Sequence, residues 1–307
     1  MIRCNNLTKQ FGNITAIENF TVSIPDGVIF GLLGPNGAGK TTTMRLMSCL
    51  LRPTKGTVQI DEYAAEQDAM KIRQMIGLLP EVPGLYETLG AYKNLEYYAQ
   101  LYGIEKQKRE ETIKSLLSNL GLWDRRNEPV SGFSKGMKQK IAIARALVHE
   151  PRYLFLDEPT ASLDPEAAKT VREYIIQLKS QGKTIVINTH NLSEAERICD
   201  TVAFVKNRVI EVGNPKRLAQ GLFSRTVRVT TTAKLTDSLR AKIQNINGIR
   251  FDAVSGNTLV FTVQNPEEEN PRIIEALQRY GIPIVFIAEE EPSLEDVYLK
   301  LIKEDGQ

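Results

Sequence analysis

The chain has 307 residues, which is enough for one large domain or two ordinary domains with buried cores of their own. Its 39 Lys and Arg residues nearly balance 37 Asp and Glu residues, so no charge excess drives nucleic-acid binding and we expect no nucleic-acid partner. Three cysteines without a C-x-x-C spacing favour a reduced intracellular setting, and no stretch reaches the roughly 18 apolar residues that span a bilayer.

The first 30 residues alternate between apolar and polar side chains, as Ile2, Cys4, Phe20, Val22 and Ile24 illustrate. This alternation predicts an antiparallel piece of sheet that covers a core with one face. An unbroken apolar run at residues 28–33 follows, which is typical of a strand buried on both faces.

Residues 34–41 read Gly-Pro-Asn-Gly-Ala-Gly-Lys-Thr, a complete G-x-x-x-x-G-K-T phosphate loop between that strand and a helical pattern. The glycines allow successive N–H groups to turn inward onto phosphate oxygens, and the start of the helix adds the positive end of its dipole. We expect Lys40 to reach the terminal phosphates and the Thr41 hydroxyl to hold Mg²⁺. The predicted nucleoside triphosphate site includes Asn36, Gly37, Ala38, Gly39, Lys40, Thr41 and Thr42.

Residues 86–148 are mostly helical in pattern and carry five tyrosines. Aromatic residues at this density predict core packing, with a docking surface as the alternative. The tyrosines are Tyr86, Tyr92, Tyr97, Tyr98 and Tyr102.

Two further apolar runs, at residues 153–156 and 184–187, predict parallel strands that are covered on both faces. Between them, Asp164 and Pro165 predict a helix start, and Gly182 predicts its end. Strand and helix therefore alternate, which predicts an α/β sheet with helices on its faces.

The strand at residues 153–156 ends in two carboxylates, Asp157 and Glu158. Paired acids at a buried strand end are costly to desolvate unless a cation lies nearby, and a magnesium ion beside the phosphate loop would supply one. We expect Asp157 to orient Mg²⁺ and Glu158 to polarise an attacking water as a general base.

After residue 220 the pattern of apolar and polar residues changes. The new pattern predicts a β-α-β-β-α-β domain of the ferredoxin-like type over residues 221–307. Its predicted elements are strand 225–231, helix 235–246, a hairpin of strands 249–253 and 259–263 around Ser255-Gly256-Asn257, helix 271–280, strand 282–288 and a closing helix 293–303.

From residue 2 to 215 the chain resembles the nucleotide-binding subunit of ATP-binding cassette transporters, because further short motifs occur in the right order around the phosphate loop. Phe11-Gly12 with Ala16 resembles the aromatic loop that stacks on adenine. Glu81 lies at the place of the glutamine loop. The other matching motifs are the signature segment 131–139, Ser162-Leu163-Asp164 for the D-loop, and His190 for the switch histidine.

This resemblance implies the fold: a P-loop NTPase cassette over residues 1–220 with an antiparallel β subdomain and a helical subdomain at about 86–148, followed by the small α+β domain. It also implies that Ser134, Gly136 and Met137 contact the γ-phosphate bound on a second subunit, so that two subunits close around two ATP molecules. His190 is then the residue that holds the γ-phosphate and the attacking water, whereas His149 has no implied role.

Two departures from the family pattern stand out. Lys135 and Met137 replace the usual residues of the signature segment, and Glu81 replaces the usual glutamine. A carboxylate at position 81 can still be a ligand of Mg²⁺, which prefers oxygen, but it cannot donate a hydrogen bond as an amide does. Both departures, and the segment 292–298, resemble the exporter branch of the family (the ABC-2-like branch).

The resemblance therefore implies an ATPase that hydrolyses ATP with Mg²⁺ and powers a separate transmembrane permease of the exporter type, from the cytoplasmic face of the cell membrane. Its implied partners are a second copy or a paralogue and the permease, whose cytoplasmic helix would contact residues 82–103. Two alternatives stay open: a C-terminal domain that senses a small ligand and regulates transport, and a soluble ATPase of the same superfamily without a transport role.

The strand at 282–288 is apolar on both faces and is predicted at a sheet edge, which invites pairing with another strand. Two interpretations follow. Either the closing helix covers this edge, or the C-terminal domain holds two subunits together when ATP is absent.

Overall fold

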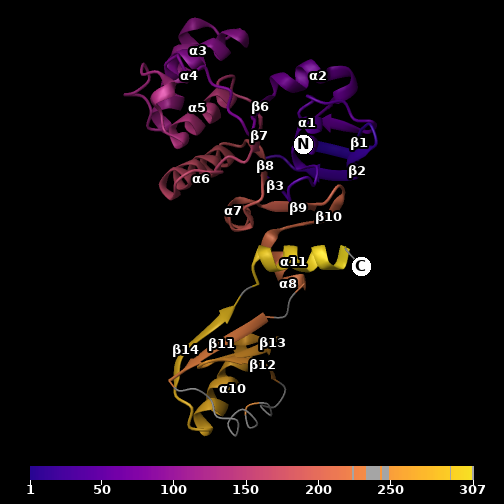
Figure 1. The fold of residues 1–307 in the computed structure, drawn as a ribbon, viewed down its shortest axis with the longest axis vertical. Coiled ribbons are helices and arrows are strands. Elements are labelled where there is room, and N and C mark those ends of the chain that lie inside the picture. Colours follow the sequence, from indigo (N-terminus) through magenta and orange to yellow (C-terminus); the bar gives the residue numbers. More distant parts are fainter. Residues whose placement is uncertain (223–224, 233–242, 244–248, 291, 306–307) are drawn as a thin grey trace. The chain divides into compact units, whose positions relative to one another are not determined.

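The computed structural model describes residues 1–222, 225–232, 243, 249–290 and 292–305. The chain divides into two compact units, Met1–Asn214 and Pro215–Gln307, each of which has a hydrophobic core of its own. The two units are described separately below (Figure 1).

The centre of the first unit is a six-stranded, mainly parallel sheet in the order β10-β9-β3-β8-β7-β6. Every residue of the interior strands β3, β8 and β7 is buried, as the unbroken apolar runs predict. Because β3, β8 and β7 are parallel neighbours, their carboxyl ends meet at one edge of the sheet. The six strands are β3 (Ile29–Leu33), β6 (Ile76–Leu79), β7 (Tyr153–Asp157), β8 (Thr184–Thr189), β9 (Thr201–Val205) and β10 (Val209–Gly213).

A second, antiparallel sheet in the order β2-β1-β4-β5 confirms the antiparallel piece predicted at the N-terminal end of the chain. Its inward side chains, Ile2, Cys4, Phe20, Val22 and Ile24 among them, are buried in one core with α1 and the parallel sheet. The elements are β1 (Ile2–Phe11), β2 (Ile14–Ile24), α1 (Lys40–Met47), β4 (Lys55–Ile60), β5 (Tyr63–Ala64) and α2 (Ala65–Gln74).

Figure 1 shows a group of helices on the opposite side of the parallel sheet from β1, β2 and α2. This group consists of α3 (Ala91–Leu101), α4 (Lys106–Asn119), the 3₁₀ turn η1 (Val130–Gly132) and α5 (Lys135–Leu147). Two more helices, α6 (Pro165–Ser180) and α7 (Leu192–Ile198), flank β8 in the chain. Asp164 caps α6 through its side chain, which accepts the Ala167 N–H at 2.8 Å, as the sequence predicts.

The interpretation of the five tyrosines as mainly core residues is wrong. Tyr86, Tyr97 and Tyr102 are 44%, 42% and 44% exposed. Tyr86, Tyr97 and Tyr98 pack edge-on against one another at centroid distances of 5.2 and 5.5 Å, so the rings bury parts of each other on the surface instead of entering the core.

The second unit contains a four-stranded antiparallel sheet in the order β12-β13-β11-β14, with the core formed on the face that carries Val227, Val229, Leu259 and Phe261. The predicted helix 235–246 lies outside the described residues except for Ile243, which is buried. The described elements are α8 (Pro215–Leu222), β11 (Arg225–Thr231), β12 (Arg250–Ser255), β13 (Thr258–Val263), α10 (Pro266–Arg279), β14 (Ile284–Glu290) and α11 (Leu294–Asp305).

The last strand, β14, lies at an edge of this sheet, as predicted. Val285 and Phe286 are each 62% exposed, and α11 packs against α8. The closing helix therefore does not cover these two side chains.

The three cysteines are all buried and unpaired. Burial raises the pKa of the Cys4 thiol to about 12 and that of the Cys49 thiol to about 11, and it also raises the pKa of Cys199. Among the described residues, no helix combines the length and apolar character needed to cross a membrane.

Candidate functional site

The phosphate loop connects the end of β3 to the start of α1 and adopts a conformation that depends on glycine. Gly37 and Gly39 have φ values of 81° and 89°, in the left-handed region that other residues resist. A Cβ atom on Gly39 would lie 2.2 Å from the carbonyl oxygen of Ala16. The loop is therefore held against the start of β2, and the Asn207 N–H supports it by donating to the Ala38 carbonyl at 3.0 Å.

Lys40 lies almost completely buried inside this loop. Its ammonium group donates to the carbonyl oxygens of Gly34 and Pro35 at 2.8 and 2.9 Å. Burial lowers the pKa of Lys40, and the nearby carboxylates of Glu158 and Asp157 oppose that effect. The cation is thus held by weak carbonyl acceptors that a phosphate could replace.

The acidic pair, Asp157 and Glu158, lies at the end of β7, beside the end of the neighbouring strand β8. Burial raises the pKa of Asp157, while hydrogen bonds from Asn188 and Thr41 act in the opposite direction. The Asn188 amide nitrogen donates to Asp157 Oδ1 at 2.5 Å and to the Thr41 hydroxyl at 3.3 Å. Asp157, Thr41 and Asn188 thus form one cluster across three elements.

Glu158 contacts His190 directly. Glu158 Oε1 accepts the His190 backbone N–H at 3.1 Å and lies 2.7 Å from Nδ1 of the ring. The other carboxylate oxygen accepts the Thr189 hydroxyl at 3.4 Å. One oxygen of Glu158 therefore orients the histidine, and the second is weakly engaged. The His190 side chain is 62% exposed.

Most of the predicted nucleotide residues line a single cavity of about 420 Å³. An adjoining cavity of about 530 Å³ shares Asn36, Glu81 and Glu158 with it and also contains His190. The first cavity is lined by Ala16, the loop residues 36–42, Glu81, Asp157, Glu158, Asn188 and Asn207, together with Ile14 and Thr15.

The residues of this cavity fit a magnesium ion. Thr41, Glu81, Asp157 and Asn188 offer hydroxyl, carboxylate and amide oxygens, which are the donors that Mg²⁺ prefers. Asn188 Oδ1 is buried and has no hydrogen-bond partner in the described part of the chain. Asn188 Oδ1 could therefore accept a hydrogen bond from a group that binds together with the nucleotide and its metal.

The signature residues lie at the start of α5. Ser134 caps this helix by accepting the Met137 N–H at 3.3 Å, and a Cβ atom on Gly136 would meet that of Ala167 at 2.8 Å. Lys135 lines the larger of the two cavities, whereas Ser134, Gly136 and Met137 line neither. Phe11 also lies outside both cavities, with its ring 48% exposed and the Lys9 ammonium 5.1 Å from the ring centroid.

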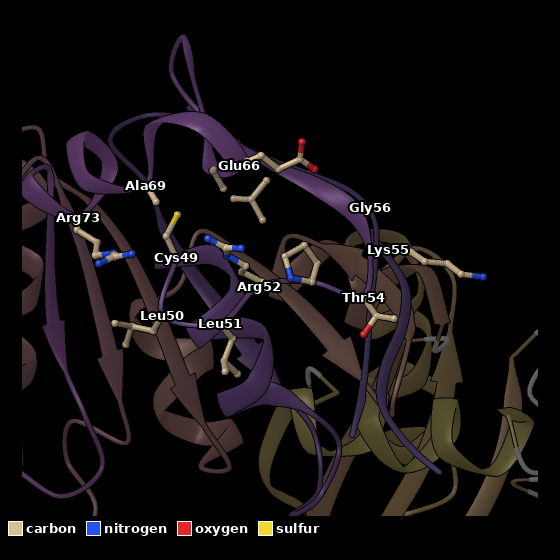
Figure 2. A pocket seen from close by; sticks show the side chains of 13 residues that line it. Cys49, Leu50, Leu51, Arg52, Thr54, Lys55, Gly56, Glu66, Ala69 and Arg73 are labelled. Atoms are coloured by element: carbon tan, nitrogen blue, oxygen red, sulfur yellow. The ribbon is translucent and has the colours of Figure 1, made fainter. Parts of the chain in front are cut away.

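A third cavity, shown in Figure 2, lies between α2 and the loop that follows α1. It measures about 470 Å³, and Arg52, Arg73 and Glu66 are among its charged lining residues. It shares no lining residue with the phosphate cavity, so the predicted chemistry does not involve it.

Sequence reasoning missed four residues of the phosphate cavity, Ile14, Thr15, Asn188 and Asn207. Asn188 had a visible signal, because it is a polar residue inside the apolar run of β8, two positions before His190. Asn207 had only a weak signal, because asparagine in a turn is common. Its left-handed φ of 58° and its donation to the Thr15 carbonyl at 3.1 Å emerge from the fold.

Comparison with known proteins gives a consistent result. Residues 17–161 match the family model described as ABC transporter, and residues 213–302 match that of an "ATP-binding protein DrrA1-3-like, C-terminal domain".

Full-length relatives are similar over nearly the whole chain. The bacitracin transport ATP-binding protein of Enterococcus faecalis is 33% identical, covering 100% of this chain and 97% of its own length. The Nod factor export ATP-binding protein I of Burkholderia lata is also 33% identical, covering 98% and 97%.

Solved structures match the first unit. The ATP-binding subunit of an ABC transporter aligns with a TM-score of 0.66 and 32% identity over 72% of this chain and 92% of its own. A dimeric ATP-binding cassette in a post-hydrolysis state with ADP and phosphate bound aligns with a TM-score of 0.64 and 28% identity over 70% and 98%.

Proposed function

Since this chain belongs to the ATP-binding cassette transporter family as an ATPase subunit, we propose that it hydrolyses ATP between two subunits to power a separate membrane exporter. The observation that carries the proposal is the Glu158–His190 pair, which lies beside a complete phosphate loop at the edge where β3, β7 and β8 end.

The chemistry follows from the side chains around the phosphate cavity. Lys40 exchanges its carbonyl partners for the terminal phosphates, and the loop N–H groups hold the remaining phosphate oxygens. Mg²⁺, when bound through Thr41, Asp157 and Glu81, supplies neutralisation of the phosphate charge. The weakly engaged oxygen of Glu158, Oε2, accepts the proton of the attacking water, and His190, fixed through Nδ1, leaves Nε2 to contact the γ-phosphate.

A second subunit completes the site in this proposal. Ser134, Gly136 and Met137 line neither cavity of their own chain, and the N-terminus of α5 is an anion-binding position. The start of α5 in one subunit would therefore face the γ-phosphate bound by the other. The dimeric state of the similar cassette with ADP and phosphate supports this arrangement.

The permease would dock on residues 82–103, at the cytoplasmic face of the membrane. This segment exposes several apolar and aromatic side chains, among them Tyr86 and Tyr97, whose rings contact each other, and exposed apolar side chains that gather on a surface mark interaction sites. The set includes Val82, Tyr86, Leu89, Tyr97, Leu101 and Tyr102. The names of the relatives, which refer to bacitracin transport and Nod factor export, favour an export direction.

The test is the substitution Glu158→Gln, with Glu173→Gln, an exposed residue of α6, as the control. The variant should bind ATP like the parent, hydrolyse it roughly 10²–10⁴-fold more slowly because the general base is lost, and accumulate as an ATP-bound dimer in light scattering. The control should match the parent. Hydrolysis by Glu158→Gln at the parental rate would remove Glu158 from this role.

A further inference from the structure

One buried side chain of the phosphate cavity has no part in the chemistry above. Asn188 lies on β8 between its register partners Leu32 of β3 and Asp157 of β7, and it is 3% exposed. A primary amide in this position costs free energy unless its polar atoms are satisfied, so its presence among apolar strands calls for a reason.

The hydrogen bonds of Asn188 explain why an amide occupies this buried position. A primary amide carries two N–H donors, and here the nitrogen contacts two different acceptors: Asp157 Oδ1 at 2.5 Å and Thr41 Oγ1 at 3.3 Å. Asp157 ends β7 and Thr41 belongs to the first turn of α1, so the amide connects the two elements that carry the expected metal ligands. Removal of these donors would free both ligands to turn away.

The oxygen of the same amide gives a second, independent observation. Asn188 Oδ1 is buried without a partner within the residues that the structure describes, whereas the nitrogen is fully used. A structural amide would be expected to satisfy both ends. This oxygen, Asn188 Oδ1, lies beside Asp157 and Thr41. It could accept a hydrogen bond from a water molecule of a hydrated cation that enters this site.

We propose that Asn188 is a positioning residue that sets the affinity of the site for magnesium, by holding Asp157 Oδ1 and the Thr41 hydroxyl where they receive the ion. The inference rests on the proposed role of the phosphate cavity and deepens it. It assigns metal affinity to a side chain that does not itself need to touch the nucleotide.

The experiment compares Asn188→Leu, which is nearly isosteric but cannot donate, and Asn188→Ser, which is smaller and keeps one donor. The matched control is Thr184→Val at the other end of β8, where an equally buried hydroxyl accepts the Gly27 N–H at 2.9 Å, away from the cavity. The affinity of each full-length protein for a fluorescent ATP analogue is measured in EDTA and across a titration with MgCl₂, and Mn²⁺ binding is followed by electron paramagnetic resonance.

We expect Asn188→Leu to bind the analogue in EDTA within about twofold of the parent. It should need roughly 10–100-fold more Mg²⁺ for the metal-dependent gain in affinity, which is the range typical for residues that orient metal ligands. Asn188→Ser should lie between the two, and Thr184→Val should keep the parental Mg²⁺ midpoint even if its thermal stability falls.

An unchanged Mg²⁺ midpoint in both Asn188 variants would overturn the proposal and leave a purely structural amide. If Asn188→Leu does not fold, the Asn188→Ser result decides alone. Failure of the parent protein itself to bind the analogue would instead count against the proposed function, so the two failures are distinguishable.

Discussion

At the scale of the residue, the predicted contact between Phe11 and adenine depends on where a bound nucleotide extends. The family resemblance implies that its ring stacks on adenine, yet the ring projects from the end of β1, half exposed, outside the phosphate cavity. An aromatic ring at this edge can receive a base only when a nucleotide extends past the cavity, so its role remains a prediction.

Phe11→Ala should weaken ATP binding by roughly 1–3 kcal/mol if the ring stacks on the base, and it should reduce the preference for ATP over other nucleoside triphosphates. Calorimetric titration of the four nucleotides would measure both effects. Tyr280→Ala, a comparably exposed ring in the second unit, is the control. An unchanged ATP affinity would place the adenine contact elsewhere.

His149 illustrates the opposite case, a histidine with a structural environment. It stacks on Tyr102 at a centroid distance of 3.8 Å, and its Nε2 donates to the Ile76 carbonyl at 3.0 Å. Nδ1 is buried without a partner in the described structure, so a second proton would have no acceptor. Burial lowers the pKa of His149 below its ordinary value, and Lys183 adds to the effect.

This lowered pKa predicts a loss of stability in acid. Above a pH of about 6.5 neither the folded nor the unfolded chain protonates His149, but below it the unfolded chain binds more protons, so the free energy of unfolding falls as the pH falls. His149→Gln should therefore lose stability less steeply between pH 7 and 5, by at most about 1.4 kcal/mol per pH unit. Denaturant titrations at several pH values test this, and parallel curves would contradict it.

At the scale of the element, the phosphate loop offers a matched pair of glycines. Gly37 and Gly39 share a positive φ, but only at Gly39 would a Cβ atom strike a backbone oxygen, that of Ala16, whereas none lies within 4 Å of the same atom on Gly37.

Gly37→Ala should cost about 1–2 kcal/mol of stability from backbone strain alone. Gly39→Ala should cost roughly 1–3 kcal/mol more, because the start of β2 at Ala16 must move away. Unfolding in urea without nucleotide would compare the two variants. Equal losses would show that the start of β2 moves freely and that the loop is not held against it.

The elements that sequence patterns predicted well are those in which local and tertiary preferences agree. In the strand before Asp157 and in the helix capped by Asp164, the apolar residues recur with the spacing of that element. The residues that mark the ends of each pattern also lie at the ends of the element in the structure. The C-terminal helix α10 was predicted to begin at Pro271, but it begins at Pro266, because either proline can occupy the first turn and three glutamates after Pro266 favour the earlier start.

Other features depend on partners that lie far away in the chain. β14 continues through Glu289 and Glu290 because these acids pair with Arg225 and Arg228 of β11, at 3.6 and 2.6 Å. The phosphate cavity likewise depends in part on residues that are distant in the sequence. The loop and the acids of β7 have local signatures, whereas the contact between Asn188 and Thr41 exists only once β8 lies beside β3.

For the whole molecule, the open question is what holds two chains together before ATP arrives. Strand β14 lies at the edge of its sheet with Val285 and Phe286 exposed, and edges of this kind pair unless a charge blocks them. We predict that the second unit contributes to a nucleotide-free dimer through this edge.

Val285→Lys should shift the full-length protein toward monomer in light scattering without nucleotide, since a lysine on an edge strand opposes pairing. Leu299→Lys, on the exposed side of α11, is the control for an added charge in the same unit. If the parent is already monomeric, the prediction of a nucleotide-free dimer through β14 fails, and the domain is better investigated as a ligand sensor or a permease contact.

The three buried cysteines have a practical consequence for experiments that follow how two chains associate and separate. Cys4, Cys49 and Cys199 are shielded from solvent, and their raised pKa values leave little thiolate at neutral pH, the form that reacts with maleimides. A single cysteine introduced on the surface, for example at the exposed Glu173 of α6, would then carry a fluorophore or spin label by itself, in a background that needs no removal of native thiols. Distances between two such labels on paired chains could follow opening and closing in real time.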